Sequence, residues 1–363
     1  MRILHISSAR TYGGGERHFV DLCRGLQERG HEVFAALRPT NQWQKRLDFL
    51  PPENVLHVSI RNSFGVLSAM RIAEFVRDNH IQIVHAHVAR DYIPASIACM
   101  AAKGSKFVLT RHVLFPLKPF NRFALQNLAR AIGVSESVSN GLGKIFPPER
   151  VTMIPNGIDL AAFDIETGSS IGAEFRSLHS IPPAAPLVGT LGELKELKGQ
   201  NDFILAAQEV LKSVPDCRFV IVGKDNSMDK SYRRDLKRLV HVCGMEDSFL
   251  WLDWLEDTAP FYAAIDVFVS PSHSESFGLA ILEAMLRGKA VVATETDGAR
   301  ELFGGLGELV EIHDPVAMAR VVTHLLADDR SRNELGAQLQ ARAGENYSLT
   351  RMIHAVEKLY AEL

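Results

Sequence analysis

The sequence has little cysteine, and the few cysteines form no pattern. Four are spread over 363 residues, with no C-x-x-C pair and no grouping of cysteine with histidine of the zinc-finger type. This spacing argues against a disulfide framework and against a structural metal held by cysteine, and it fits a reducing cytoplasm. The cysteines are Cys23, Cys99, Cys217 and Cys243.

Long apolar runs are also missing. No segment approaches the roughly 20 uninterrupted apolar residues that a membrane-spanning helix requires. The apolar start of the chain, Ile3–Ile6, meets Arg10 and Gly13 too soon for a signal peptide. We therefore expect a cytoplasmic protein, in which any contact with a membrane is peripheral.

Acidic residues are absent from one long stretch. No Asp or Glu lies between Tyr92 and Ser135, although the chain has 43 acidic and 40 basic residues and a net charge of −3. Two interpretations remain open, a solvated basic face and a surface for an anionic lipid or a phosphorylated acceptor. No recognised nucleic-acid module accompanies the stretch, so we expect no nucleic-acid partner. Its basic and apolar residues include Lys103, Lys106, Arg111, His112, Phe115, Leu117, Lys118, Phe120, Arg122, Phe123 and Arg130.

The glycine fingerprint G-x-G-x-x-G of dinucleotide-binding folds does not occur, which disfavours a nicotinamide dehydrogenase. A different glycine cluster, Gly13-Gly14-Gly15, follows the first predicted strand and opens the first helix. It is either a flexible turn or a turn that lets a phosphate approach the backbone closely.

Apolar strands and amphipathic helices alternate along both halves of the chain, which is typical of doubly wound parallel sheets. Because 363 residues exceed the size at which one hydrophobic core keeps growing, we expect two domains. A cleft between two such domains is where open α/β folds bind ligands. The strands are predicted at 3–6, 32–36, 81–86, 107–110, 131–134, 151–154, 187–191, 218–222, 249–252, 267–270 and 290–293. The helices are predicted at 16–29, 67–79, 91–103, 120–130, 136–145, 201–214, 232–243, 258–264, 278–286, 316–328, 331–345 and 350–363.

The alternating pattern fades between Asp159 and Pro186, where glycine, serine and proline accumulate. This composition predicts a domain boundary. The N-terminal domain is expected to cover 1–165 and the C-terminal domain 166–347. The last helix, about 348–363, can pack back on the first domain.

Two carboxylates flank a Phe-Gly step in the second half. Glu275 lies in the loop after the strand at 267–270, and Glu283 lies inside the apolar helix that Gly278 opens. The unpaired backbone N–H groups at the start of a helix suit a phosphate, and Gly278 would let it approach. A carboxylate among apolar neighbours, as at Glu283, needs a polar partner such as a ribose diol.

This segment resembles the E-x7-E motif of the retaining glycosyltransferases of family 4, which have the GT-B fold, and the resemblance covers nearly the whole chain. It implies an enzyme that moves a sugar from a nucleotide diphosphate sugar to a hydroxyl of a glycan, a lipid-linked or another acceptor, in bacterial-type glycan or glycolipid assembly. It implies no metal and no cofactor. A sugar-nucleotide epimerase or hydrolase and a non-catalytic nucleotide-sugar-binding subunit are the alternatives.

The resemblance also implies roles for individual residues. His112, in Thr110-x-His112, would lie beside the donor sugar, Lys198 would bind the diphosphate, and Glu275 would hold sugar hydroxyls. Glu283 would bind the ribose. The remaining donor-side residues are Gly14, Gly15, Glu193, Gly223, Phe277, Gly278 and Leu279.

One position departs from the family pattern. Glu193 stands where the family has an arginine that binds the diphosphate. Because a carboxylate repels a phosphate, we expect Glu193 to pair with Lys195, Lys198 or another base, or to accept hydrogen bonds from a sugar.

His85 and His87 end another strand, with rings on the same side. A metal would need further ligands, and none is evident from the sequence, so no metal site is predicted. His87 and Arg111 are assigned to the acceptor side.

Overall fold

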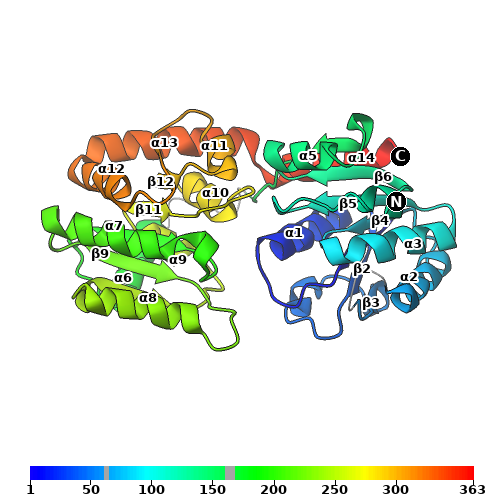
Figure 1. Ribbon diagram of the computed structural model, residues 1–363, viewed down its shortest axis with the longest axis horizontal. Helices are drawn as coiled ribbons and strands as arrows, with labels where there is room; N and C mark the ends of the chain where they lie inside the picture. Colours follow the sequence, from blue (N-terminus) through cyan, green and yellow to red (C-terminus); the bar gives the residue numbers. More distant parts are fainter. Residues whose placement is uncertain (61–64, 160–167) are drawn as a thin grey trace. The chain divides into compact units, whose positions relative to one another are not determined.

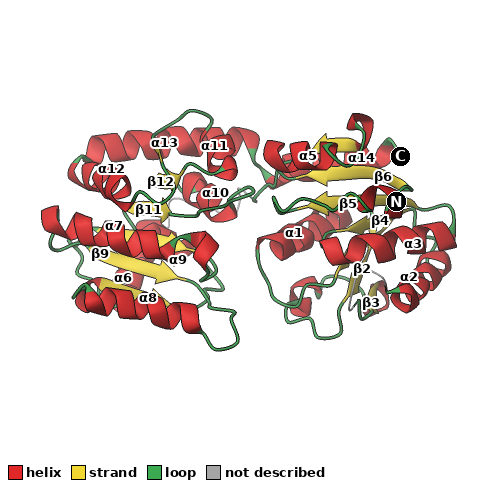
Figure 2. Cartoon of the chain, viewed as in Figure 1, coloured by secondary structure: helices red, strands yellow, loops and turns green. Residues whose placement is uncertain are grey.

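The computed structural model describes residues 1–60, 65–159 and 168–363. It divides the chain into two compact units, here called unit 1 (Met1–Gly157 with Leu349–Leu363) and unit 2 (Ile158–Ser348). In both units strands lie between layers of helices (Figure 2). The domain boundary expected at 165/166 falls outside the described residues.

Unit 1 is built on a parallel sheet whose described strands lie in the order β3-β2-β1-β4-β5-β6-β7. Its strands are β1 (Arg2–Ser7), β2 (Glu32–Leu37), β3 (Val55–His57), β4 (Ile83–Ala86), β5 (Lys106–Arg111), β6 (Leu128–Gly133) and β7 (Val151–Met153). Its helices are α1 (Gly14–Glu28), α2 (Val66–Asp78), α3 (Tyr92–Ala102), α4 (Asn121–Ala124), α5 (Glu136–Gly143) and α14 (Leu349–Ala361).

Unit 2 repeats this plan with the strand order β10-β9-β8-β11-β12-β13. Its strands are β8 (Leu187–Leu191), β9 (Arg218–Val222), β10 (Phe249–Leu252), β11 (Val267–Ser270), β12 (Ala290–Thr294) and β13 (Leu309–Val310). Its helices are α6 (Gly168–Leu178), α7 (Gln200–Ser213), α8 (Ser231–Val242), α9 (Ala259–Ala264), α10 (Leu279–Leu286), α11 (Asp297–Phe303), α12 (Pro315–Ala327) and α13 (Asp329–Asn346). The α/β fold class expected from the sequence is confirmed.

The last helix, α14, completes the core of unit 1. It packs against α1, and Figure 1 shows it, in red, among the elements of the N-terminal unit. Ile353 and Val356 are buried in the same cluster as Phe19 of α1. The contact is close, because a Cβ added to Gly25 of α1 would lie 2.0 Å from Cδ1 of Ile353.

The helix expected over 120–130 is wrong. The structure has only α4 there, and the chain is already extended at Leu128, which pairs with Phe107 of β5. A helix of that length would need a surface on which to bury its aromatic side chains. Phe120 and Phe123 remain more than half exposed instead.

Four of these strands and helices were not expected. The strands β3 and β13 lie at sheet edges and are too short to show alternation. The helix α6 falls where a boundary was expected. The helix α11 begins at a Thr296 cap whose hydroxyl accepts a hydrogen bond from the Ala299 N–H, and it ends at Gly304.

The packing of α14 predicts that Ile353→Ala lowers the free energy of unfolding of unit 1 by about 2–5 kcal/mol, because it leaves a cavity in the core. The neighbouring exposed residue gives the matched control, and His354→Ala should change it by less than about 0.5 kcal/mol. Urea unfolding can be followed through Trp43, which lies in this core, after Trp251 and Trp254 are replaced by phenylalanine. Equal effects of the two substitutions would show that α14 contributes little to unit 1.

Candidate active site

Both sheets reverse their strand order at one point, and the predicted catalytic residues follow strands at or beside these points. In unit 1 the reversal lies between β1 and β4, and in unit 2 it lies between β8 and β11. Ligands of open α/β sheets bind at the carboxyl ends of such strands. Lys198 follows β8 and Glu275 follows β11, while His112 follows β5, the neighbour of β4.

The glycine turn of unit 1 lies beside His112. Gly14 is exposed and is the first residue of α1, with Gly13 as its cap. A Cβ added to Gly15 would contact the His112 ring at 3.7 Å. The structure therefore brings together the glycine pair and the histidine that the sequence analysis placed at the donor.

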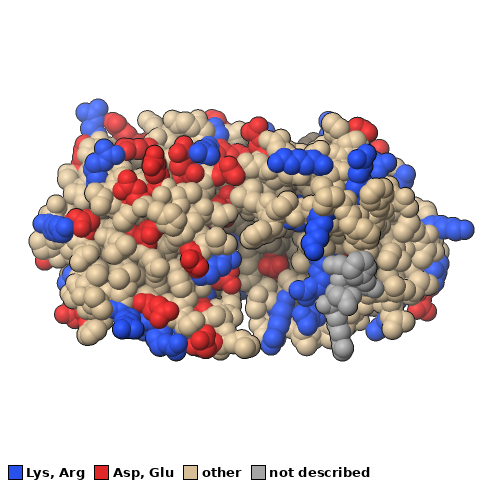
Figure 3. Space-filling model, viewed as in Figure 1, with Lys and Arg blue, Asp and Glu red and all other residues tan. Residues whose placement is uncertain are grey.

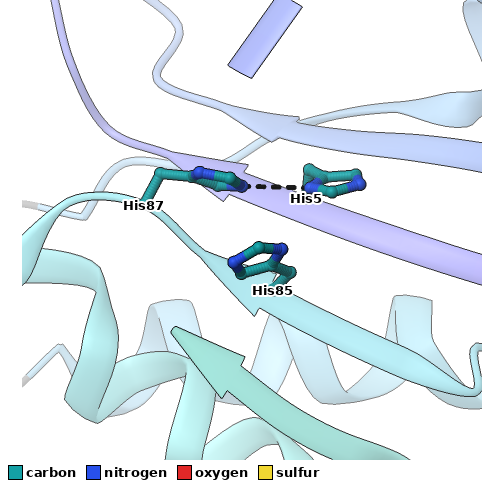
Figure 4. Close-up of side chains that lie close together, drawn as sticks. All are labelled: His5, His85 and His87. Atoms are coloured by element: carbon teal, nitrogen blue, oxygen red, sulfur yellow. Dashed lines mark hydrogen bonds between the residues drawn. The ribbon is translucent and has the colours of Figure 1, made fainter. Parts of the chain in front are cut away.

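Five histidines cluster behind this turn. Figure 4 shows His5 on β1 beside His85 and His87, with His5 Nδ1 3.0 Å from His87 Nε2. The ring centroids of His85 and His87 are 4.2 Å apart. The rings of His18 and His112 also pack edge to face, with their centroids 4.7 Å apart.

These imidazoles are held neutral by burial. Burial lowers the pKa of His5 to about 3 and that of His18 to about 4. Burial, and then the neighbouring histidines, lower the pKa of His85 and of His87 well below 6.5. The pKa of His112 is also lowered well below 6.5, first by burial and then by His18 and Arg111. A neutral imidazole both donates and accepts a hydrogen bond, so His112 can contact a sugar hydroxyl in either sense.

The extra ligands that a metal on His87 would require are present, although the sequence did not reveal them. The ligand atoms of His5, His85 and His87, and those of His18, His87 and His112, lie within 4.8 Å of one another. His85 is nevertheless engaged at both nitrogens, with the Tyr360 hydroxyl at 2.5 Å and the Thr110 hydroxyl at 2.7 Å. We interpret His85 as a residue of the core.

His5 and His18 were missed in the sequence because their proximity depends on strand order. In the sheet, His5 is the register partner of His85, eighty residues further along the chain. The one signal in the sequence was the alternation of side chains along β1, which places the His5 ring on the same face of the sheet as Ile3.

Arg111 is buried, and its guanidinium donates to the Phe115 carbonyl. This bond closes the turn after β5. Its assignment to the acceptor side, like that of His87, stays a prediction.

A partly buried ion pair joins the two loops at the strand reversal of unit 2. Lys198 Nζ lies 2.5 Å from Glu275 Oε2, and the two side chains are 24% and 15% exposed. The loops are pressed together beneath the pair. Gly199 has φ +65°, and a Cβ there would lie 1.9 Å from the Pro271 carbonyl oxygen, so a larger residue does not fit. The His273 N–H donates to the Leu197 carbonyl at 2.9 Å.

Glu193, where the chain departs from the pattern that the resemblance implies, is paired. Its carboxylate lies 2.7 Å from Lys195 Nζ and accepts a hydrogen bond from Asn226 at 2.9 Å. Burial raises the pKa of Glu193, but the hydrogen bonds from Lys195 and Asn226 and the charges of Lys195 and Lys198 outweigh it, so the pKa is lowered. The pairing with a lysine expected for Glu193 is confirmed.

Glu283 has found a polar partner in the apolar helix α10. Its side chain is buried and accepts a hydrogen bond from the Thr258 hydroxyl at 3.1 Å. Gly278 caps the helix with φ +100°, and Phe277 before it is buried against Tyr347. Leu279 begins the helix and is partly exposed.

Gly223 permits a close contact between two loops of unit 2. A Cβ there would lie 2.0 Å from the Gly192 carbonyl oxygen, and the Gly192 N–H donates to Val222. Gly223 thus fixes the turn that carries Glu193. Its assignment to the donor side stays a prediction.

Comparison with known families identifies the chain. The family model described as Glycosyltransferase Family 4 matches residues 12–162, and that described as Glycosyl transferases group 1 matches 185–328. The chain is a glycosyltransferase of the family 4 type. Its relatives are named as glycosyltransferases. These names do not favour the alternatives of a non-catalytic subunit, an epimerase or a hydrolase.

Two curated relatives match over most of their length. A D-inositol 3-phosphate glycosyltransferase from Xylanimonas cellulosilytica is 28% identical, with 96% of this chain and 92% of the relative covered. A lipopolysaccharide core biosynthesis glycosyltransferase from Rhizobium meliloti is 26% identical, with 92% of each covered. Both relatives are glycosyltransferases by name, and the second is named for lipopolysaccharide core biosynthesis.

Solved structures share the GT-B fold. HepE from Anabaena, in complex with UDP and glucose, has a TM-score of 0.88 at 21% identity over 100% of both chains. A glycosyltransferase from Rickettsia africae has a TM-score of 0.88 at 22% identity, with 99% of this chain and 98% of that chain covered. Within the described residues, no helix of the glycosyltransferase combines the length and the apolar character needed to cross a bilayer.

The buried histidines predict a loss of stability in acid. The unfolded chain takes up a proton at His5 below about pH 6.5, whereas the folded chain does not until about pH 3, so stability falls as the pH drops through this range. At about pH 5, His5 alone should lower the free energy of unfolding by about 2 kcal/mol.

Urea unfolding of unit 1 at about pH 7.5 and about pH 5 measures this effect. In His5→Gln the difference between the two pH values should shrink by about 2 kcal/mol, because glutamine does not titrate. The control His354→Gln alters an exposed histidine of α14 and should keep the original difference. An unchanged difference in His5→Gln would contradict the assignment.

Proposed function

We propose that this glycosyltransferase moves a sugar from a nucleoside diphosphate sugar to an acceptor hydroxyl with retention at the anomeric carbon and without a metal at the diphosphate. The observation that carries the proposal is the Lys198–Glu275 pair at the strand reversal of unit 2. Its place is where a nucleotide binds in an open α/β sheet. The E-x7-E spacing of Glu275 and Glu283 supports retention, because it is that of the retaining family.

The leaving nucleoside diphosphate gains negative charge as the glycosidic bond breaks. Lys198 and the N-terminal N–H groups of α10 would stabilise that charge more strongly in the transition state than in the bound donor. An ammonium group has three donors, so Lys198 can hold Glu275 and a phosphate oxygen together. Glu275 would in turn accept hydrogen bonds from the donor sugar.

The other donor contacts follow from the same placement. Glu283, already bonded to Thr258, would bind the ribose, and the backbone of Phe277, Gly278 and Leu279 would face the phosphates. In unit 1, Gly14 and Gly15 would approach the diphosphate, with neutral His112 beside the sugar. No protein side chain is assigned as a nucleophile. A phosphate oxygen of the leaving group would accept the acceptor's proton.

The nucleoside of the donor is proposed to be uridine. HepE, which shares the fold over its whole length, holds UDP in its crystal structure. The salt bridge of Glu193 with Lys195 supports a role in donor choice, because it presents a carboxylate where the family has an arginine.

The acceptor is proposed to be a glycan or a lipid-linked hydroxyl compound presented at an anionic surface. The acid-free stretch supports this, since Phe115 and Phe123 are 68% and 75% exposed beside Lys118 and Arg122. On the face shown in Figure 3, Lys and Arg are more common than Asp and Glu over the N-terminal unit. Exposed aromatic and basic side chains together suit an anionic membrane.

Nucleotide release from a panel of nucleotide sugars, with and without acceptors, tests the function. Lys198→Met should lower kcat/KM by about 100- to 1,000-fold, because it removes a charge that stabilises the transition state. Lys212→Met is the matched control, since this lysine of α7 pairs with Glu209 and is 65% exposed, and it should change kcat/KM by less than about tenfold.

Full activity in Lys198→Met would contradict its role at the diphosphate. The anomeric configuration of the product, read by NMR, decides whether the transfer is retaining. Activity that persists in a chelator supports metal-independent transfer. A lack of turnover with all common nucleotide sugars would favour the binding-subunit alternative.

The surface proposal predicts salt-sensitive binding to vesicles. Phosphatidylglycerol vesicles should bind the protein more strongly than phosphatidylcholine vesicles, and binding should weaken between about 0.05 and 0.5 M salt. The double substitution Phe115→Ser and Phe123→Ser should reduce binding. Leu67→Ser, which alters an exposed apolar residue of α2, serves as the control. Equal sedimentation with both vesicle types would leave the solvated-face interpretation.

A further inference from the structure

Unit 2 holds a second group of ligand-bearing side chains, close along the chain to Lys198 and Glu275. Asp202 lies in the first turn of α7, His273 in the loop after β11, and His313 between β13 and α12. Asp202 Oδ2 lies 2.8 Å from His273 Nε2 and 3.2 Å from His313 Nδ1. The two imidazole centroids are 4.0 Å apart.

The donor set is that of a zinc-class cation. Two imidazole nitrogens and one carboxylate oxygen suit Zn²⁺, whereas Mg²⁺ and Ca²⁺ prefer oxygen ligands. Zinc bonds of about 2.0–2.2 Å in tetrahedral geometry place ligand atoms about 3.3–3.6 Å apart. The three ligand atoms here already lie within 4.8 Å of one another, so small side-chain movements would complete the geometry.

Two side chains of the group are mostly buried, and the third is exposed to solvent. The side chains of Asp202 and His273 are 12% and 16% exposed, and that of His313 is 66% exposed. A cation would have an entry path from solvent over His313 and would keep one coordination position for water or another ligand.

The backbone connects this group to the ion pair. The Asp202 N–H donates to the Gly199 carbonyl, and the His273 N–H donates to the Leu197 carbonyl, both at 2.9 Å. A cation bound to Asp202 and His273 would therefore tie the segment carrying Lys198 to the loop carrying Glu275.

We propose that Asp202, His273 and His313 form a binding site for one zinc-class divalent cation that clamps these loops of unit 2. The cation takes no part in the transfer step, which fits a reaction that needs no metal at the diphosphate. The competing explanation is that Asp202 accepts hydrogen bonds from both imidazoles and binds no metal. The two explanations differ in whether the protein takes up a cation.

Isothermal titration of the chelator-treated 363-residue chain with ZnCl₂ separates the two explanations. We expect one equivalent to bind, and excess Mg²⁺ should not displace it. His313→Ala removes the exposed ligand and should weaken Zn²⁺ binding by at least about tenfold. The control His324→Ala removes an exposed histidine of α12 that lies outside the group and should leave the affinity unchanged.

Thermal melts test whether unfolding causes the weaker Zn²⁺ binding of His313→Ala. In chelator, His313→Ala should have the same melting temperature as the unsubstituted protein, because His313 is largely exposed. Zn²⁺ should raise the melting temperature of the unsubstituted protein only. Absence of stoichiometric binding, or equal affinity in His313→Ala, would overturn the proposal. Both measurements omit sugar donors, so their outcome is independent of the proposed transfer reaction.

Discussion

The ion pair between Lys198 and Glu275 constrains the loops around it. Each charge is mostly withdrawn from water, and a desolvated charge is tolerated only when its partner is held at bonding distance. That distance requires two backbones to meet, which they do because Gly199 offers no side chain to the Pro271 carbonyl. The main-chain bonds of this contact also include Asp202 and His273, so the charge pair and the second polar group share one backbone contact between the loops after β8 and β11.

The two units accommodate polar side chains at the carboxyl ends of their strands in different ways. Unit 2 uses charges that compensate each other, as in the pairing of Glu193 with Lys195. Unit 1 uses imidazoles that stay neutral, such as buried His87 and partly buried His112, because burial and then neighbouring histidines or Arg111 lower their pKa. Neutral imidazoles suit the uncharged hydroxyls of a sugar, whereas an ammonium group suits the charge of a phosphate.

Strands with continuous apolar runs were predictable from the sequence. The predicted bounds of β8, β9 and β11 coincide with the observed ones, because strands buried on both faces carry no competing helical period. The helix expected at 120–130 failed for the opposite reason, since its aromatic residues have helical spacing but no core to cover. Local charge compensation at Glu193 was predictable because its partner Lys195 is two residues away. Groups assembled by strand order, such as His5 with His85 or Asp202 with His313, were not, because sequence separation carries no information on which strands become neighbours.

The return of α14 to unit 1 has a consequence for how the protein is made. Unit 2 is one continuous segment, whereas the core of unit 1 contains Met352, Ile353, Val356, Leu359 and Tyr360 from the end of the chain. A ribosome therefore delivers every residue of unit 2 before it delivers the last part of unit 1. During synthesis, the first unit to begin is completed only after unit 2 has been made, and the face of α1 that α14 will cover stays open to chaperones until α14 has been synthesised.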